Sequence, residues 1–186
     1  DQISHGRLEL GLGAGWNTDE ANAYGIDLLD IKDRMDRFDE ACDMIVSLLT
    51  QERSTYAGTH YALDEAYCEP KAIQQPHPPI CIGGSGEKRT LRTVARVAQH
   101  WNYVGGPVAE FERLKGVIAE HCATFDRDPA EIMTSAHLHL NRDDPEALRA
   151  QAEEFAAAGL DLGIVYLPPP HTPADLETVA EMVAGI

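Results

Sequence analysis

From residue 80 onward, apolar strand-forming segments alternate with amphipathic helix-forming segments, and this rhythm restricts the fold more than any other feature of the sequence. The expected strands are residues 80–83, 100–104, 133–140 and 162–167, and the expected helices are residues 87–98, 108–125, 145–158 and 173–183. Strands that alternate with helices pair in parallel and are joined by right-handed crossovers. The sequence therefore predicts an α/β protein with a parallel sheet.

The part of the chain before this rhythm adds one more strand and one more helix. Residues 7–14, RLELGLGA, are a strand candidate that ends in glycines, and residues 30–50 carry apolar side chains at helical spacing. Residues 55–63 indicate a short hairpin, and residues 69–79 contain four prolines, which favour an extended path over the surface. We therefore expect a hairpin and proline-rich insertion at about residues 53–79.

The expected elements make five βα units in one domain over residues 1–186. A doubly wound sheet and a (β/α)8 barrel both fit this pattern. A barrel needs eight units in about 250 residues, so the chain is three units short of a complete one.

The composition narrows the classes of partner. The net charge of −16 disfavours nucleic acids and anionic membrane surfaces, although an acidic exterior still permits a local basic pocket for a phosphorylated ligand. No apolar run is long enough to span a bilayer. The four cysteines show no CxxC spacing, so we expect reduced, mostly buried thiols in a cytoplasmic protein.

A glycine-rich turn, GGSGEKRT, follows the apolar run at residues 80–82. It is not a P-loop, because no glycine directly precedes Lys88. Free backbone N–H groups, the Ser85 hydroxyl and the start of a helix favour an anion site. Lys88 and Arg89 lie in the expected first helical turn, where the helix dipole gives them no benefit and a nearby anion would explain them. The alternative is a surface turn with solvated basic side chains.

A second glycine-rich stretch, GLGAGWN at residues 11–17, only partly matches the dinucleotide-binding fingerprint GxGxxG. Trp16 occupies the third glycine position. We expect no helix before about Asp30, whereas the fingerprint runs directly into a helix. The alternative is a barrel strand whose small residues leave room at its carboxyl end.

His137 and His139 alternate on one expected strand, so both side chains face the same side, as in a metal-binding pair. No third ligand of similar quality stands out, and we predict no metal; polar residues that line a barrel mouth are the simpler interpretation. Trp101 and Asn102 end the preceding strand. There the aromatic ring and the amide would flank a planar ligand, or the ring would belong to a core layer.

Four stretches of the sequence are informative as an ordered set. They are DQISHGRLELGLGAGWN, DRFDEA, TYAGTHYAL and EPKAIQQPHPPICIGGSGEKRTLRTVARVAQHWN. This set resembles the bacterial luciferase-like monooxygenase superfamily, most closely its deazaflavin (coenzyme F420)-dependent oxidoreductases, over almost the whole chain. The resemblance implies a TIM-type (β/α)8 barrel in which Arg7 begins the fourth strand. The chain would then be a partial barrel of strands 4–8, and the first three βα units would precede Asp1.

The resemblance also implies FMN or F420 at the carboxyl-terminal mouth of the barrel, with no catalytic residue assigned. The turn after the fifth strand would receive the cofactor phosphate. Small residues at the end of the fourth strand would lie beside the ring system, because they allow close backbone approach. The implied cofactor-binding residues are Gly13, Ala14, Gly15, Gly84, Ser85, Gly86, Lys88, Arg89, Trp101 and Asn102.

The implied function is an oxidoreductase or monooxygenase that transfers a hydride between F420 or FMN and a small organic substrate, or uses reduced flavin with oxygen. One alternative is a non-catalytic partial barrel that binds a cofactor or dimerises. Another is a different phosphate-binding barrel enzyme, such as an isomerase or aldolase, but no lysine stands at a recognisable strand end for Schiff-base chemistry. An open five-stranded sheet exposes its edges, so we expect a homo-oligomer.

Overall fold

The computed structural model describes residues 1–186 and contains a five-stranded parallel sheet and a separate antiparallel hairpin. The sheet strands are β1 (Leu10–Leu12), β4 (Ile80–Gly83), β5 (His100–Tyr103), β6 (Met133–His139) and β7 (Leu162–Tyr166), and the hairpin strands are β2 (Ser54–Ala57) and β3 (Ala62–Ala66). The helices are α1 (Thr18–Ala23), α2 (Ile31–Thr50), α3 (Thr90–Val97), α4 (Val108–Thr124), the 3-10 helix η1 (Pro129–Glu131), α5 (Glu146–Ala157) and α6 (Pro173–Met182). The predicted α/β class with a parallel sheet is confirmed.

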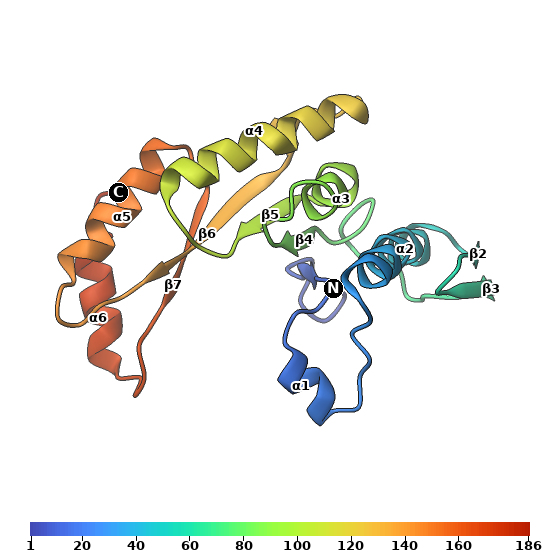
Figure 1. Ribbon diagram of the computed structural model, residues 1–186, viewed down its shortest axis with the longest axis horizontal. Coiled ribbons are helices and arrows are strands. Elements are labelled where there is room, and N and C mark those ends of the chain that lie inside the picture. Colours follow the sequence, from blue (N-terminus) through green and yellow to red (C-terminus); the bar gives the residue numbers. More distant parts are fainter.

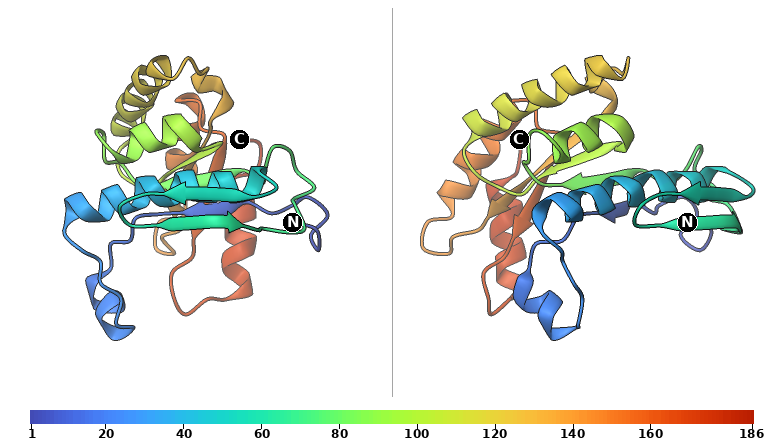
Figure 2. Two further views of the ribbon diagram at one scale, coloured as in Figure 1. Left: turned by 90° about the vertical axis from the view of Figure 1, so that its right-hand side faces the viewer. Right: turned by 45° about the vertical axis from the view of Figure 1, so that its right-hand side comes forward.

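The strand order separates the two topologies that the sequence left open. The strands lie in the order β1-β4-β5-β6-β7, which follows the chain without a reversal. A doubly wound sheet reverses its order at a switch point and carries helices on both faces. Here α3, α4, α5 and α6 lie along one side of the sheet, and the whole molecule forms an arc with these helices outside and the strands inside (Figures 1 and 2). The doubly wound alternative is therefore wrong.

The core lies between the strands and the outer helices. Alternate strand residues, such as Ile82, Trp101 and Leu138, belong to one cluster of 22 buried side chains that includes helix residues of α2, α3, α4 and α5. Trp101 is fully buried and stacks on Phe111 of α4, with ring centroids 5.6 Å apart. Burying a large apolar side chain stabilises a fold by roughly 1.5–3 kcal/mol, so this layer holds helices and sheet together.

The opposite face of the sheet carries polar side chains on its central strands. Cys81 of β4 is paired in register with His100 of β5, and Asn102 of β5 is paired with Ser135 of β6. Since paired residues of parallel strands point to the same face, these side chains share the inner side of the arc. The inner face therefore brings polar side chains of β4, β5 and β6 together.

Several element boundaries differ from the expected ones. The expectation that no helix precedes Asp30 is wrong, because α1 begins directly after Asn17, whose side chain accepts a hydrogen bond from the Glu20 backbone at 3.1 Å. The helix expected from residue 87 begins only at Thr90, after a turn in which Gly84 has a φ of +119°. The expected strand over residues 7–14 shortens to β1.

The hairpin is attached to α2 by one carboxylate. Glu40, in the middle of α2, accepts hydrogen bonds from the backbone N–H groups of Thr59 and His60, both at 2.8 Å, and of Tyr61 at 3.3 Å. These three N–H groups belong to the turn between β2 and β3, so the carboxylate fixes the tip of the hairpin. Figure 2 shows the hairpin projecting beside α2 at one end of the arc.

All four cysteines are free, but only two of them are buried as expected. Cys42 and Cys122 are fully buried, whereas Cys68 and Cys81 are partly exposed. Burial raises the pKa of Cys42 to about 12, so this thiol is protonated and unreactive. No helix combines the length and the apolar character that crossing a bilayer requires.

Candidate functional site

A well-formed hollow of the protein lies at the carboxyl ends of the parallel strands. It has a volume of about 780 Å³, within the range of small-molecule sites. Ligands of parallel α/β sheets bind at this end, because the loops that follow the strands converge there. The lining residues are Leu12, Gly13, Ala14, Gly15, Trp16, Ile31, Arg34, Met35, Phe38, Gly83, Gly84, Thr90, Val104, His137 and Tyr166.

Glycines leave backbone surface open on one wall of this cavity. A methyl group added to Gly13 would meet no atom within 4 Å, and one added to Gly83 would make only ordinary contacts, the shortest at 3.7 Å. The Cβ atoms missing at these positions therefore leave space that a flat ligand can use. Gly84 differs, because its φ of +119° lies in a region that favours glycine for conformational reasons.

Arg34, which the sequence reasoning missed, gives the cavity its cation. It lies in the first turn of α2, lines the cavity and has a buried Nε atom with no hydrogen-bond partner. A buried donor without a partner is costly. Arg34 is the one lysine or arginine among the lining residues, so an anion bound in the cavity would face its guanidinium. The sequence contained a usable signal: Arg34 stands one turn before Phe38 and beside Met35, on the face of the helix that is otherwise apolar.

The predicted residues divide into two groups. Gly13, Ala14, Gly15 and Gly84 come together in the cavity wall, from the ends of β1 and β4. Six others do not line it: Ser85, Gly86, Lys88, Arg89, Trp101 and Asn102.

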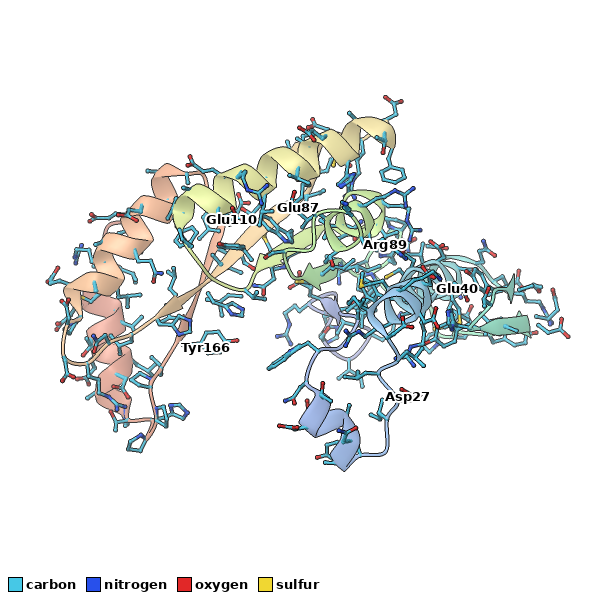
Figure 3. The ribbon with its side chains drawn as sticks, in the orientation of Figure 1. Asp27, Glu40, Glu87, Arg89, Glu110 and Tyr166 are labelled. Carbon is cyan, nitrogen blue, oxygen red and sulfur yellow. The ribbon has the colours of Figure 1, made fainter.

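The turn that follows β4 accounts for four of those six. Ser85, Gly86 and Lys88 are exposed there, next to Gly84. The basic residue Arg89 points to α2, where its guanidinium donates to Asp36 at 2.6 Å and to Asp39 at 2.9 Å (Figure 3). These ion pairs explain the position of Arg89 without an anion, and the Arg89 hydrogen bond holds the pKa of Asp36 below its usual range.

Trp101 and Asn102 lie on opposite faces of β5, outside the cavity lining. The Trp101 ring lies in the helix-facing core, and its indole Nε1 donates to the carbonyl of Gly84 at 2.8 Å. The Asn102 amide nitrogen donates to the Ser135 hydroxyl at 2.8 Å on the inner face. The core-layer alternative for Trp101 therefore describes the structure.

His137 and His139 share a face, as the alternation predicted, and both rings contact Tyr166 of β7, with centroids 4.7 and 5.3 Å from the tyrosine ring. Only His137 lines the cavity with Tyr166, which points to the inner side of the arc (Figure 3). Burial, aided by nearby His139, lowers the pKa of His137. Near neutral pH its imidazole is therefore uncharged and offers one N–H donor and one acceptor.

Residues 1–182 match the family model described as luciferase-like monooxygenase. The chain belongs to the luciferase-like monooxygenase family. This confirms the resemblance drawn from the four sequence stretches.

Two curated relatives in this family carry names of different cofactors. One is the FMNH(2)-dependent dimethylsulfone monooxygenase of Pseudomonas putida, 30% identical over 157 residues, covering 84% of this chain and 42% of that protein. The other is the F420-dependent glucose-6-phosphate dehydrogenase of Beutenbergia cavernae, 32% identical over 152 residues, covering 80% of this chain and 43% of that protein. This luciferase-like chain therefore spans less than half the length of either relative.

The fold is also that of solved structures. An F420-dependent secondary alcohol dehydrogenase, solved with an F420-acetone adduct, superposes with a TM-score of 0.83 at 16% sequence identity. The match covers 98% of this chain and 70% of that one. The arrangement of elements is therefore shared over nearly the whole of this luciferase-like chain.

Proposed function

We propose that this luciferase-like chain is part of a flavin- or deazaflavin-dependent oxidoreductase whose cofactor, FMN or F420, occupies the cavity at the carboxyl ends of the strands. The observation that carries the proposal is the pairing of the open glycine wall with Arg34. The open glycine wall gives space for a planar ring system, and the Arg34 guanidinium gives a cation for a phosphate. The names of the two relatives support both cofactors as candidates.

The residues of the cavity fit such a ligand by size and by chemistry. Gly13 and Gly15 would lie beside the ring system, while the guanidinium of Arg34 would bind the phosphate, with the exposed N–H groups of Ser85 and Gly86 and the ammonium of Lys88 near by. When bound, the cofactor would supply hydride transfer or oxygen activation, and the protein would supply binding and orientation.

The proposed roles of the remaining cavity residues follow from their contacts. The neutral imidazole of His137, held against Tyr166, would hydrogen-bond the substrate or the polar edge of the ring. Trp101 would keep the Gly84 turn in place through its indole hydrogen bond. We assign no catalytic acid or base, and the substrate is a small organic molecule that this face alone does not define.

We further propose that the sheet represents strands 4–8 of a (β/α)8 barrel formed as one domain over residues 1–186, with an insertion at about residues 53–79. The sequential strand order and the one-sided helices support this proposal. Strands supplied by further polypeptide would close the arc and complete the cavity. Without them, the alternative function is a cofactor-binding module that does not turn over.

A titration of the purified protein with FMN and with F420, followed by absorbance and fluorescence, tests the proposal. Filling the glycine wall with Gly13→Val should weaken binding at least about tenfold, while leaving the free energy of unfolding within about 1 kcal/mol, because the new side chain meets open space. Gly116→Val on α4 is the matched control, since a Cβ there also meets nothing within 4 Å. Equal affinity in the two variants, or no binding by the unchanged protein, would contradict the proposal.

A further inference from the structure

A second cluster of functional side chains lies on the inner face, toward the amino-terminal ends of the strands. Glu9 precedes β1, Cys81 belongs to β4 and His100 begins β5. The register pairs Gly11 of β1 with Cys81 and pairs Cys81 with His100, so three adjacent strands bring these side chains together. The carboxylate, thiol and imidazole ligand atoms all lie within 4.8 Å of one another, and no other group of three such residues does so.

We propose that Glu9, Cys81 and His100 bind a divalent transition-metal ion, with Zn²⁺ as the reference ion. Thiolate, imidazole and carboxylate are all zinc ligands, whereas a thiolate disfavours Mg²⁺ and Ca²⁺. Three protein ligands leave at least one position for water, as in open zinc sites. On binding, a metal–sulfur bond forms and the Cys81 thiol proton passes to the solvent.

The surroundings of His100 orient its ring for this role. His100 is 3% exposed, and its Nε2 lies 2.7 Å from the hydroxyl of Ser135, which is itself fully buried. Nδ1 therefore faces Glu9, whose carboxylate oxygen is 2.5 Å away. Metal-ligating histidines characteristically use the second ring nitrogen in such a hydrogen bond, which fixes the orientation of the ring.

An ion would have to replace the present contact between Glu9 and His100. Ligand atoms around tetrahedral zinc lie about 3.3–3.6 Å apart, given bond lengths near 2.0 and 2.3 Å. The Glu9 side chain is 41% exposed, so it can rotate outward by the required distance. A hollow of about 410 Å³, lined by both Glu9 and His100, connects this position to the surface.

The proposed metal site is independent of the proposed cofactor site, because none of its three ligands lines the larger cavity. The sequence reasoning missed it for a physical reason: Glu9, Cys81 and His100 show no short spacing and meet only through the strand register. His137 and His139, whose alternation in the sequence is that of a metal-binding pair, belong to no such group of three.

Titration of chelator-treated protein with Co²⁺ tests the inference, because a cobalt–thiolate bond gives a charge-transfer absorption band in the near ultraviolet. We expect one Co²⁺ per chain with this band, and loss of the band when Zn²⁺ is added. Cys81→Ser should abolish the band and His100→Gln should weaken binding at least tenfold. The matched controls are Cys68→Ser, a partly exposed thiol outside the cluster, and His139→Gln, an exposed imidazole.

A wild-type titration without the charge-transfer band would overturn the proposal, and this result does not depend on any variant folding. A band that persists in Cys81→Ser would also overturn it, because the thiolate would then come from elsewhere. Circular dichroism of each variant establishes that it is folded. If Cys81→Ser does not fold, a tenfold loss in His100→Gln against unchanged binding in His139→Gln supports the site, and equal binding in these two variants overturns it.

Discussion

At the scale of single residues, the candidate cofactor site depends most on Arg34. Its Nε atom is the one buried side-chain polar atom without a hydrogen-bond partner in the whole protein, and its guanidinium has no ion pair. Native proteins retain few such groups, because each loses its hydration without compensation. Arg34 is also the one lysine or arginine that lines the cavity, so a ligand phosphate bound there would pair with its guanidinium.

Arg34→Ala should weaken the binding of FMN or F420 by about 10- to 100-fold, because hydrogen bonds to charged groups contribute about 1.5–3 kcal/mol. The ligand-free variant should unfold at the same temperature as the wild type or higher, since the change removes an unsatisfied donor. Lys32→Ala is the control: it removes the same charge from the same helix at a side chain that is 76% exposed. Isothermal titration calorimetry that gives both variants one affinity would exclude Arg34 from the site.

A second residue-scale prediction concerns pH and Asp175. This side chain is 4% exposed and accepts from Arg142 at 2.7 and 2.8 Å, and from the backbone and hydroxyl of Thr172. The Arg142 hydrogen bonds, then the Thr172 backbone, hold the pKa of Asp175 well below its usual range. A lowered pKa stabilises the fold above the unfolded-state value of about 3.9, and this contribution is lost as the pH falls through the folded-state value.

Asp175→Asn should therefore lower the melting temperature at neutral pH, and the difference from the wild type should shrink progressively below about pH 4. Asp144→Asn serves as the control, because Asp144 is exposed and its carboxylate accepts no hydrogen bond. Thermal unfolding across this pH range measures both variants. A difference that stays constant from neutral to acid pH would show that the carboxylate charge is not responsible.

At the scale of elements, the sequence was most informative where one local pattern decides the structure. Apolar spacing predicted α2 to within one residue, since the expected range 30–50 is observed as Ile31–Thr50, and the expected helix over 173–183 is observed as α6. The start of α3 was misplaced because residues 87–89 form a turn, and three polar residues in sequence fit a turn as well as a first helical turn. The Glu9–Cys81–His100 cluster was beyond prediction, since it depends on which strands lie side by side. For Trp101 the sequence left two positions open, and only the structure decides between them.

The hydrogen bonds between the Glu40 carboxylate and the hairpin turn give a prediction at the scale of elements. Backbone hydrogen bonds, first that of His60, lower the pKa of Glu40, so the carboxylate is charged when it holds the hairpin tip. Glu40→Ala should leave α2 intact and speed amide hydrogen exchange of Thr59, His60 and Tyr61 by at least about tenfold, because their acceptor is lost. Glu52→Ala, an exposed carboxylate without a hydrogen bond, should change nothing there. Unaltered exchange in Glu40→Ala would mean that other contacts hold the hairpin.

At the scale of the whole molecule, the sheet is open, and each of its two edge strands has one side without a hydrogen-bonded neighbour strand. β1 pairs only with β4 and β7 only with β6, so each has an unpaired edge. Exposed Leu162 and Tyr166 add apolar surface to β7. Unpaired edges promote association, which is why we propose either further strands that close the barrel or a homo-oligomer.

The central claim is that FMN or F420 binds where the strands end, and hydrogen exchange with and without cofactor tests it most directly. We predict slower exchange on cofactor addition in residues 12–16, 31–38 and 83–90, which contribute most of the cavity wall. The second hollow, of about 530 Å³ around Lys115 and Ile132, should remain unchanged. Protection confined to that second hollow, or no protection in the three cavity segments at saturating cofactor, would contradict the account.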